Sequence, residues 1–345
     1  MNGSAGTFER VGVKTRIRQP IAAAWGNDRV SAVLAGAAVL AVVIAVAVAP
    51  SRLPDAMATT AKPFLEVGAI VAVGWLAVRI GAVETLTSSW RSWGRATNIT
   101  MVLGLCVLLS GLFNLDVAVG IAVPVSLFAA AEAGLDAGLL VIAVANVANA
   151  TSFLLPTSSL TNLLVMGTQP MAAGQYLAST WLAWLLVTMV TLAFLVPLIL
   201  RRPRPRHART ISIDWSLGRI ALDLVAMFFV ASGLHAVWTT GITLPGGFAM
   251  QTLTGSMLAS AVDNLPAAAV VHGGAGLGPW TAILAMSIGA NVFLIGSVAT
   301  VISRRLAAES GARFSLATFT LIGVALLPLQ LSAAYVGLRV TGAIA

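Results

Sequence analysis

Two aspartates, Asp116 and Asp263, carry the chemistry that this sequence suggests first, because each interrupts a long apolar stretch. Asp116 ends the run 114–116 (Asn-Leu-Asp), and Asp263 opens the run 263–266 (Asp-Asn-Leu-Pro). An ionisable side chain at membrane depth is costly unless it is paired or hydrated, so it indicates ion or solute binding. If the two carboxyls meet, their titrations are coupled, and one could carry a proton while the other orients a solute. The alternative interpretation gives each aspartate a structural role as the cap of a turn.

Amides and hydroxyls accompany the two aspartates in four apolar segments. A single serine or threonine in such a segment often bonds to a helix carbonyl, which is a structural role. A run of them is harder to explain without a polar cavity, so the runs predict a binding site. The candidate solute- and ion-binding residues are Asn114, Asp116, Asn149, Thr151, Ser152, Thr157, Ser158, Ser159, Asn162, Asp263, Asn264, Asn291, Gly296 and Ser297.

The composition places these residues in a membrane. The chain has 345 residues, of which 58% are hydrophobic and only 9% charged, against about 25% charged residues in soluble domains. The run 30–49 has neither charge nor proline and is long enough to cross a bilayer as a helix. The single cysteine, Cys106, excludes a disulfide framework and a cysteine-based metal site. We expect no enzyme, no metal and no cofactor, because no nucleophile–base pair or metal cluster stands at membrane depth.

The apolar segments are arranged in two similar halves, 30–200 and 216–345. Each half gives a spanning helix, a hairpin, a broken helix and a spanning helix in that order. We expect re-entrant hairpins at about 99–128 and 252–271, with arms of about ten to fifteen residues that are too short to span. We expect broken spanning helices at about 138–167 and 277–303. Non-helical backbone at membrane depth is tolerated only inside protein or beside a wet cavity.

The charges predict the orientation of these elements. With a cytoplasmic N-terminus, 17 of the 20 lysines and arginines, Arg305 among them, fall at cytoplasmic ends, and only Arg52, Lys62 and Arg339 fall outside. The basic segment 1–29 and the basic linker 201–215 are then cytoplasmic. The net charge of +8 is accordingly an orientation signal rather than a nucleic-acid patch.

The fold class expected is therefore an all-α, multi-pass protein of the cell membrane with inverted-topology repeats, each containing a re-entrant hairpin and a discontinuous transmembrane helix. Inverted repeats with discontinuous helices are typical of secondary transporters. The alternative from a different functional class is a membrane-embedded enzyme, or a non-transporting relative with a receptor or assembly role.

Four segments resemble the signatures of the arsenite efflux permeases of the ion transporter superfamily. They are 112–124 (LFNLDVAVGIAVP), 148–162 (ANATSFLLPTSSLTN), 260–266 (SAVDNLP) and 295–300 (IGSVAT). More distantly, they resemble the divalent anion/sodium symporters and the citrate transporters. By position, the resemblance assigns Asp116 to the family's hairpin aspartate. It assigns Asn264 and Pro266 to the asparagine and proline of the family's second hairpin. It assigns Ser158 and Asn162 to polar residues of the first broken helix.

The resemblance implies an elevator-like carrier that exports arsenite or antimonite against protons across the inner membrane. It also implies a possible homodimer and, as in some arsenite pumps, a cytosolic ATPase subunit. Relatives move dicarboxylates or citrate with sodium, or exchange sodium for protons, and this remains the alternative function. The coupling ion is accordingly expected to be a proton, with sodium as the alternative.

The sequence also departs from that family. Leu115 precedes the hairpin aspartate where the family has asparagine, Asp263 and Ser159 replace asparagines, and the loop from Asn291 to Gly296 is short. There are fewer scaffold helices. With one cysteine, arsenite would have to be recognised as a neutral, hydroxyl-bearing solute. No lysine or arginine stands near a hairpin tip, which mildly favours a neutral or cationic substrate.

Overall fold

The computed structural model describes residues 29–345 except 89, 91–92, 203–216, 239–241 and 273–276, and these residues are almost entirely helical. The basic segment 1–28 and most of the linker lie outside the described residues. The longer helices are α1 (Arg29–Val48), α2 (Leu53–Arg79), α4 (Arg95–Leu112), α5 (Leu115–Ala133), α8 (Ala173–Arg201), α9 (Leu217–Val237) and α14 (Leu316–Val340). The shorter elements are α3 (Ala82–Ser88), α6 (Ala137–Ala150), η3 (Pro156–Ser158), α7 (Leu160–Thr168), β1 (Ile242–Thr243), α10 (Phe248–Val262), α11 (Asn264–Val270), β2 (Val271–His272), α12 (Trp280–Ile288), η4 (Gly289–Asn291), η5 (Leu294–Gly296) and α13 (Val298–Glu309).

Six of the described helices are long and apolar enough to cross a membrane: α1, α4, α5, α8, α9 and α14. Large apolar side chains on these helices face outward, such as Val43 at 57% and Leu321 at 70% exposure. Such surfaces are expected against lipid, because in water they would be an aggregation hazard. The expectation of an all-α polytopic membrane protein is confirmed at this level.

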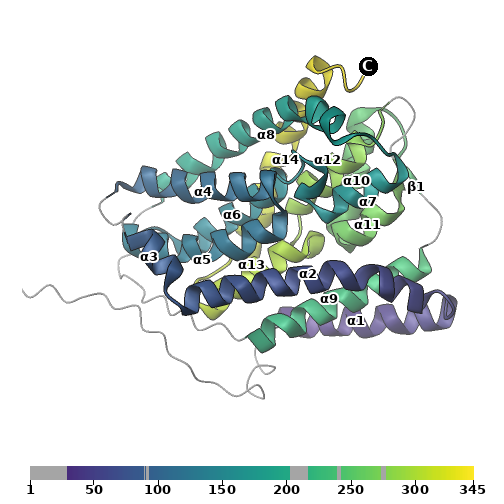
Figure 1. The fold of residues 1–345 in the computed structure, drawn as a ribbon, viewed down its shortest axis with the longest axis horizontal. Coiled ribbons are helices and arrows are strands. Elements are labelled where there is room, and N and C mark those ends of the chain that lie inside the picture. The colour runs from purple at the N-terminus through teal and green to yellow at the C-terminus, as the bar shows by residue number, and fades with distance from the viewer. Residues whose placement is uncertain (1–28, 89, 91–92, 203–216, 239–241, 273–276) are drawn as a thin grey trace, which may run out of the picture.

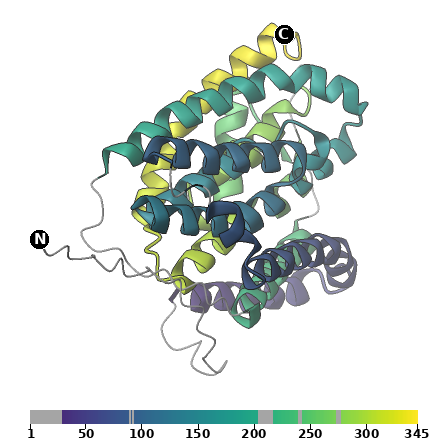
Figure 2. The ribbon, with the colours of Figure 1, turned by 60° about the vertical axis from the view of Figure 1, so that its left-hand side comes forward.

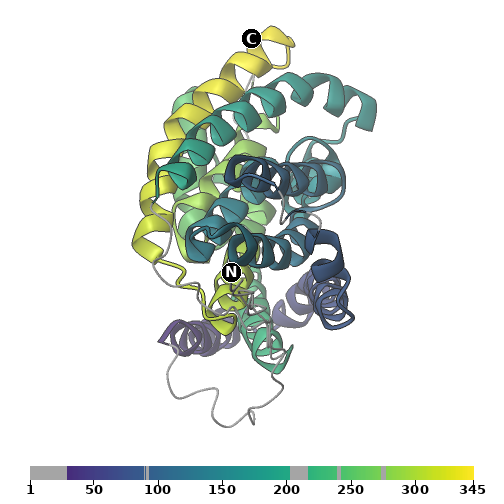
Figure 3. The ribbon, with the colours of Figure 1, turned by 90° about the vertical axis from the view of Figure 1, so that its left-hand side faces the viewer.

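The helices form a layer and a larger body. Helices α1, α2 and α9 make the layer, hereafter the three-helix layer, which lies beneath the other helices in Figures 1 and 3. Helix α9 packs against both α1 and α2, and α2 packs against α5 of the body. The approach of α2 to α5 is close because Gly74 and Gly120 meet there, and a Cβ on Gly74 would collide with the Gly120 carbonyl.

Two helices of the body are interrupted. The first runs as α6, then η3, then α7, and the second runs as α12, then η4 and η5, then α13. In Figure 1, α6 and α13 lie toward the left of the body, whereas α7 and α12 lie toward the right. Helix α6 packs on α13, and α7 packs on α12, so the two interrupted helices run past each other in opposite directions. Both breaks fall within the ranges that the sequence predicted, although α13 continues to Glu309.

Two helical hairpins stand beside the interrupted helices. Helices α4 and α5 pack together and are joined at Phe113-Asn114, and α10 and α11 are joined at Asp263. The arms of the first hairpin are 18 and 19 residues long, about 27–28 Å at 1.5 Å per residue. The arms were expected to be too short to span a membrane, and this is wrong. The hairpin was predicted at 99–128, but α4 begins four residues earlier, at Arg95, and α5 ends five residues later, at Ala133.

Helices α8 and α14 cover the breaks from the side opposite the three-helix layer. They lie side by side along one edge of the molecule, teal and yellow in Figure 2. The indole Nε1 of Trp184 on α8 donates to the Thr151 carbonyl in the first break at 2.8 Å. Gly323 on α14 lies against the backbone of Asn291 in the second break. Each break is thus held by its own covering helix.

Candidate binding site

A pocket lies where four helices begin. Its empty volume is about 370 Å³, a figure that includes open solvent at its mouth. The first residues of α5, α7, α11 and α13 form most of its wall, and α2 of the three-helix layer closes the remaining side. Both hairpin tips and both breaks therefore meet at one place. The lining residues are Phe64, Val67, Leu115, Asp116, Ser159, Leu160, Thr161, Asn264, Leu265, Ser297 and Val298.

Asp116 is the acidic residue among the described lining residues. It lies half-buried in the first turn of α5, where the helix dipole stabilises a negative charge. The turn is capped by Asn114, whose Oδ1 accepts a hydrogen bond from the backbone N–H of Asp116 at 2.7 Å. The cap uses the backbone of Asp116, so the carboxyl itself is not needed to form the turn.

Asp263 lies beside the pocket in a strained conformation. Its φ is 83° and its ψ is 143°, and among the described residues it is the one non-glycine residue with positive φ. This region is essentially reserved for glycine and costs about 1–3 kcal/mol for other residues. Such strain persists only where the surrounding structure enforces it, and it clusters at functional sites.

The carboxyl of Asp263 is only half satisfied. The residue is 2% exposed, and its Oδ1 accepts from the backbone N–H of Leu265 at 2.9 Å. Its Oδ2 is buried with no hydrogen-bond partner among the described residues. Asp116 lines the pocket that Asp263 adjoins. A proton or a cation would supply the partner that this oxygen lacks.

The two hairpin tips are built alike, but their aspartates are not equivalent. Asn114 caps α5 by accepting from the residue two positions later, and Asp263 caps α11 in the same way. Asp263 therefore corresponds to Asn114, and Asp116 corresponds to Leu265. Both aspartates therefore lie at hairpin tips, but at different positions within the turn.

The two breaks share one backbone geometry. Leu155 (φ −118°, ψ 156°) precedes η3, and Phe293 (φ −121°, ψ 152°) precedes η5. Ser159 (φ −151°, ψ 145°) and Ser297 (φ −155°, ψ 133°) follow them. The two serines begin α7 and α13 and bring their side chains to the pocket wall.

Other predicted site residues lie off the pocket wall, and most of them bond within the protein. The buried Oδ1 atoms of Asn149 and Asn162 have no hydrogen-bond partner among the described residues. Asn149 Nδ2 donates to Asn291 Oδ1 and to Thr300 Oγ1, both at 3.0 Å, which joins the two interrupted helices. Asn162 Nδ2 donates to the Ser152 carbonyl at 2.7 Å. Three hydroxyls donate to backbone carbonyls: Thr151 to Val147, Ser152 to Asn149 and Ser158 to Gly111. Thr157 is exposed, and Gly296 packs against the Ala290 carbonyl.

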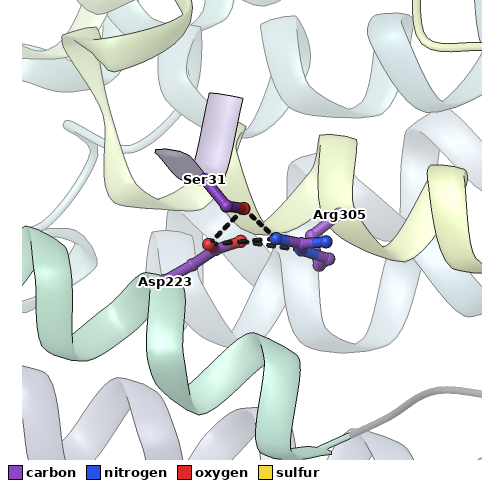
Figure 4. Close-up of polar contacts among 3 residues, drawn as sticks. All are labelled: Ser31, Asp223 and Arg305. Carbon is purple, nitrogen blue, oxygen red and sulfur yellow. Dashed lines mark hydrogen bonds and ion pairs between the residues drawn. The ribbon is translucent and has the colours of Figure 1, made fainter. Parts of the chain in front are cut away.

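A buried ion pair is the feature that the sequence reasoning missed. Arg305 on α13 binds Asp223 on α9 through Nε at 2.7 Å and through Nη2 at 3.0 Å, and both residues are 5% exposed. Ser31 on α1 donates to Asp223 Oδ1 at 2.8 Å and also contacts Arg305 Nη2 (Figure 4).

The sequence did hold a signal for this pair. Asp223 lies inside an apolar segment, so the rule that marked Asp116 and Asp263 would have marked it too. Arg305, counted above among the charges at cytoplasmic ends, is buried and paired with Asp223.

No protein-family model matches the chain, and no curated protein matches it either. The fold and the site define the class on their own. The chain is a multi-span helical membrane protein with a pocket of mixed apolar and polar lining at the meeting point of two hairpins and two interrupted helices.

Proposed function

We propose that this chain is a secondary active transporter that carries a small polar solute through the pocket. The observation that carries the proposal is the convergence of both hairpin tips and both breaks on one pocket. Discontinuous helices offer unpaired backbone groups and half-helix dipoles, which hold polar solutes without a permanent buried charge. Alternating access then follows when one bundle moves against another around such a site.

Internal repetition supports the proposal. Helix α5 packs on α13 as α11 packs on α7, and α4 packs on α6 as α10 packs on α12. Ser110 Oγ on α4 donates to the Ala148 carbonyl, and Ser260 Oγ on α10 donates to the Gly289 carbonyl at the corresponding place. Figure 1 places the first hairpin toward the left and the second toward the right. Two related halves of opposite orientation account for all of these pairs.

The pocket wall favours a small neutral solute with several hydroxyls. Asp116, Asn264 and the hydroxyls of Ser159, Thr161 and Ser297 offer both donors and acceptors. None of the described lining residues is a lysine or an arginine. Arsenite, antimonite or a similar oxyacid fits this chemistry, in keeping with the sequence resemblance. We assign proton coupling to Asp116 and Asp263, and we place the protein in the cell membrane as an exporter.

One observation favours a second candidate. The N-termini of α5, α7 and α13 all lie at the pocket, and helix N-termini attract anions. A dicarboxylate or citrate that enters with sodium would use those dipoles, with Asp263 contributing to the cation site. Sodium/proton exchange is a variant of this alternative.

A panel of solutes and ions tests the proposal. Everted membrane vesicles that contain the chain are energised to acidify their lumen, and arsenite, antimonite, citrate and succinate uptake is measured with and without sodium. We expect arsenite or antimonite uptake that collapses when the proton gradient is dissipated. Sodium-dependent uptake of citrate or succinate would select the alternative. If no solute moves above the level of vesicles without the protein, the transporter proposal fails.

A further inference from the structure

The ion pair and the pocket lie on the same boundary. Phe64 and Val67 on α2 belong to the three-helix layer, and the rest of the pocket wall belongs to the body. Asp223 and Ser31 also belong to the layer, whereas Arg305 belongs to the body. The pair therefore ties together the two parts between which the pocket is enclosed.

One helix connects the two features directly. Helix α13 begins at the pocket with Ser297 as its N-cap and Val298 as its first residue. Arg305 lies seven residues further along the same helix, about 10 Å away at 1.5 Å per residue. Because a helix this short moves as a rigid rod, a shift of α13 at the pocket is also a shift at Arg305.

Partly separated states of the Asp223–Arg305 pair are unfavourable. A bidentate arginine–carboxylate pair needs both hydrogen bonds in register, and Ser31 Oγ donates a further bond to the carboxylate. Separating the two buried charges breaks these bonds, which is strongly unfavourable until water or another partner replaces them. The pair is therefore either closed or fully released.

We infer that Asp223, Arg305 and Ser31 form a latch that holds the three-helix layer against the body, with the pocket wall on α2 held beside the wall on α13. The latch opens when the pocket wall on α2 separates from the wall on α13. This inference rests on the proposed function, because a carrier must separate these walls to exchange its solute.

A variant that removes both charges tests the latch. Asp223→Asn is isosteric, and Arg305→Gln shortens the side chain but keeps it polar; together they remove both charges of the pair, so the fold is expected to survive. The reporter is Val67→Cys on the pocket wall, in a Cys106→Ala background so that it is the one thiol. A water-soluble maleimide then reports how often the pocket opens in the full chain, purified in lipid nanodiscs. We expect labelling about tenfold faster in the double variant.

Two further variants sharpen the test. Arg313→Gln removes an exposed arginine and should label at the wild-type rate. Ser31→Ala keeps both charges but removes one hydrogen bond, so labelling about two- to threefold faster is expected. Wild-type labelling in a monodisperse double variant overturns the latch. If the double variant aggregates, Ser31→Ala decides, and an unchanged rate there overturns the latch equally.

The labelling needs no solute and no ion gradient. Absence of flux for every solute would overturn the proposed function and leave the labelling result intact. Wild-type labelling would overturn the latch and leave the flux result intact.

Discussion

At the scale of single residues, Asp263 combines three features that are unfavourable for the stability of the fold. It is buried, its φ is 83°, and one carboxyl oxygen lacks a partner among the described residues. Glycine would adopt the positive φ freely, and asparagine would keep the cap of α11 without a buried charge. A carboxylate is retained there instead, which is the pattern expected of a residue with a binding or proton-carrying task.

Substitution at Asp263 should reveal this strain. Asp263→Gly relieves the positive φ and Asp263→Ala does not, although both remove the cap. We expect the glycine variant to exceed the alanine variant in unfolding free energy by about 2 kcal/mol. Denaturant unfolding of the purified chain in detergent measures both values.

Asp136 provides the matched control. It caps α6 by accepting from the N–H of Leu139 at 3.0 Å, and its φ is an ordinary −73°. There the glycine variant should exceed the alanine variant by only about 0.5–1 kcal/mol, the difference found at ordinary caps. Equal differences at the two sites would mean that Asp263 is not strained.

Asp116 should matter for transport and little for folding. Asp116→Asn keeps the hydrogen bond from its backbone N–H to Asn114, so the unfolding free energy should change by less than about 1 kcal/mol. Gradient-driven uptake should fall at least about 100-fold, because the amide cannot carry a proton. Asp136→Asn changes an exposed carboxyl and should leave uptake unchanged. Unchanged uptake in Asp116→Asn would refute proton carriage by this residue.

At the scale of elements, the breaks and hairpin tips were predictable from the sequence. Asparagine, serine, glycine and proline cluster at 149–159 and 289–297, and these residues compete with helix formation. The capping roles were less predictable, because only the turn geometry shows that Asp263 matches Asn114 rather than Asp116. Hairpin arm length was also underestimated, because the polar turn marks a tip but nothing so clear marks the far ends.

The contact between α14 and the second break gives a prediction for an element. A Cβ on Gly323 would collide with the Asn291 carbonyl, so Gly323→Ala must push α14 away from the break. We expect a loss of about 1–3 kcal/mol in unfolding free energy. Gly104→Ala is the control, because nothing lies within 4 Å of its Cβ. That variant should be neutral or stabilised by up to about 1 kcal/mol. A similar effect of the two variants on thermal unfolding would count against the close contact.

At the scale of the whole molecule, composition alone established the membrane class, but it could not show how helices distant in sequence pair. Asp223 and Arg305 are 82 residues apart, and nothing in their local sequence shows that they meet. The pocket too depends on five segments brought together by packing. Tertiary contacts of this kind lie beyond what periodicity and motif spacing can predict from one sequence.

The charged ends of the molecule predict its orientation. The end of α2, the start of α4 and the end of α8 lie together on the left in Figure 1, and Arg95 Nη2 donates to the Arg202 carbonyl there at 3.2 Å. Arg52 and Arg339 lie at the other ends of α2 and α14. By the positive-inside rule the arginine-rich end faces the cytoplasm. Reporter fusions should therefore place residue 209 in the cytoplasm and residue 345 outside, and the reverse assignment would contradict this orientation.

The most direct test of the account is solute-driven proton movement by the purified chain. Proteoliposomes are loaded with a pH-sensitive dye, and arsenite is added outside without any imposed gradient. A proton-coupled exporter exchanges entering solute for leaving protons, so the account predicts that the lumen becomes more alkaline with the wild-type chain. With Asp116→Asn the lumen pH should not change. A lumen pH that stays constant with the wild-type chain while arsenite enters would contradict proton coupling through this pocket.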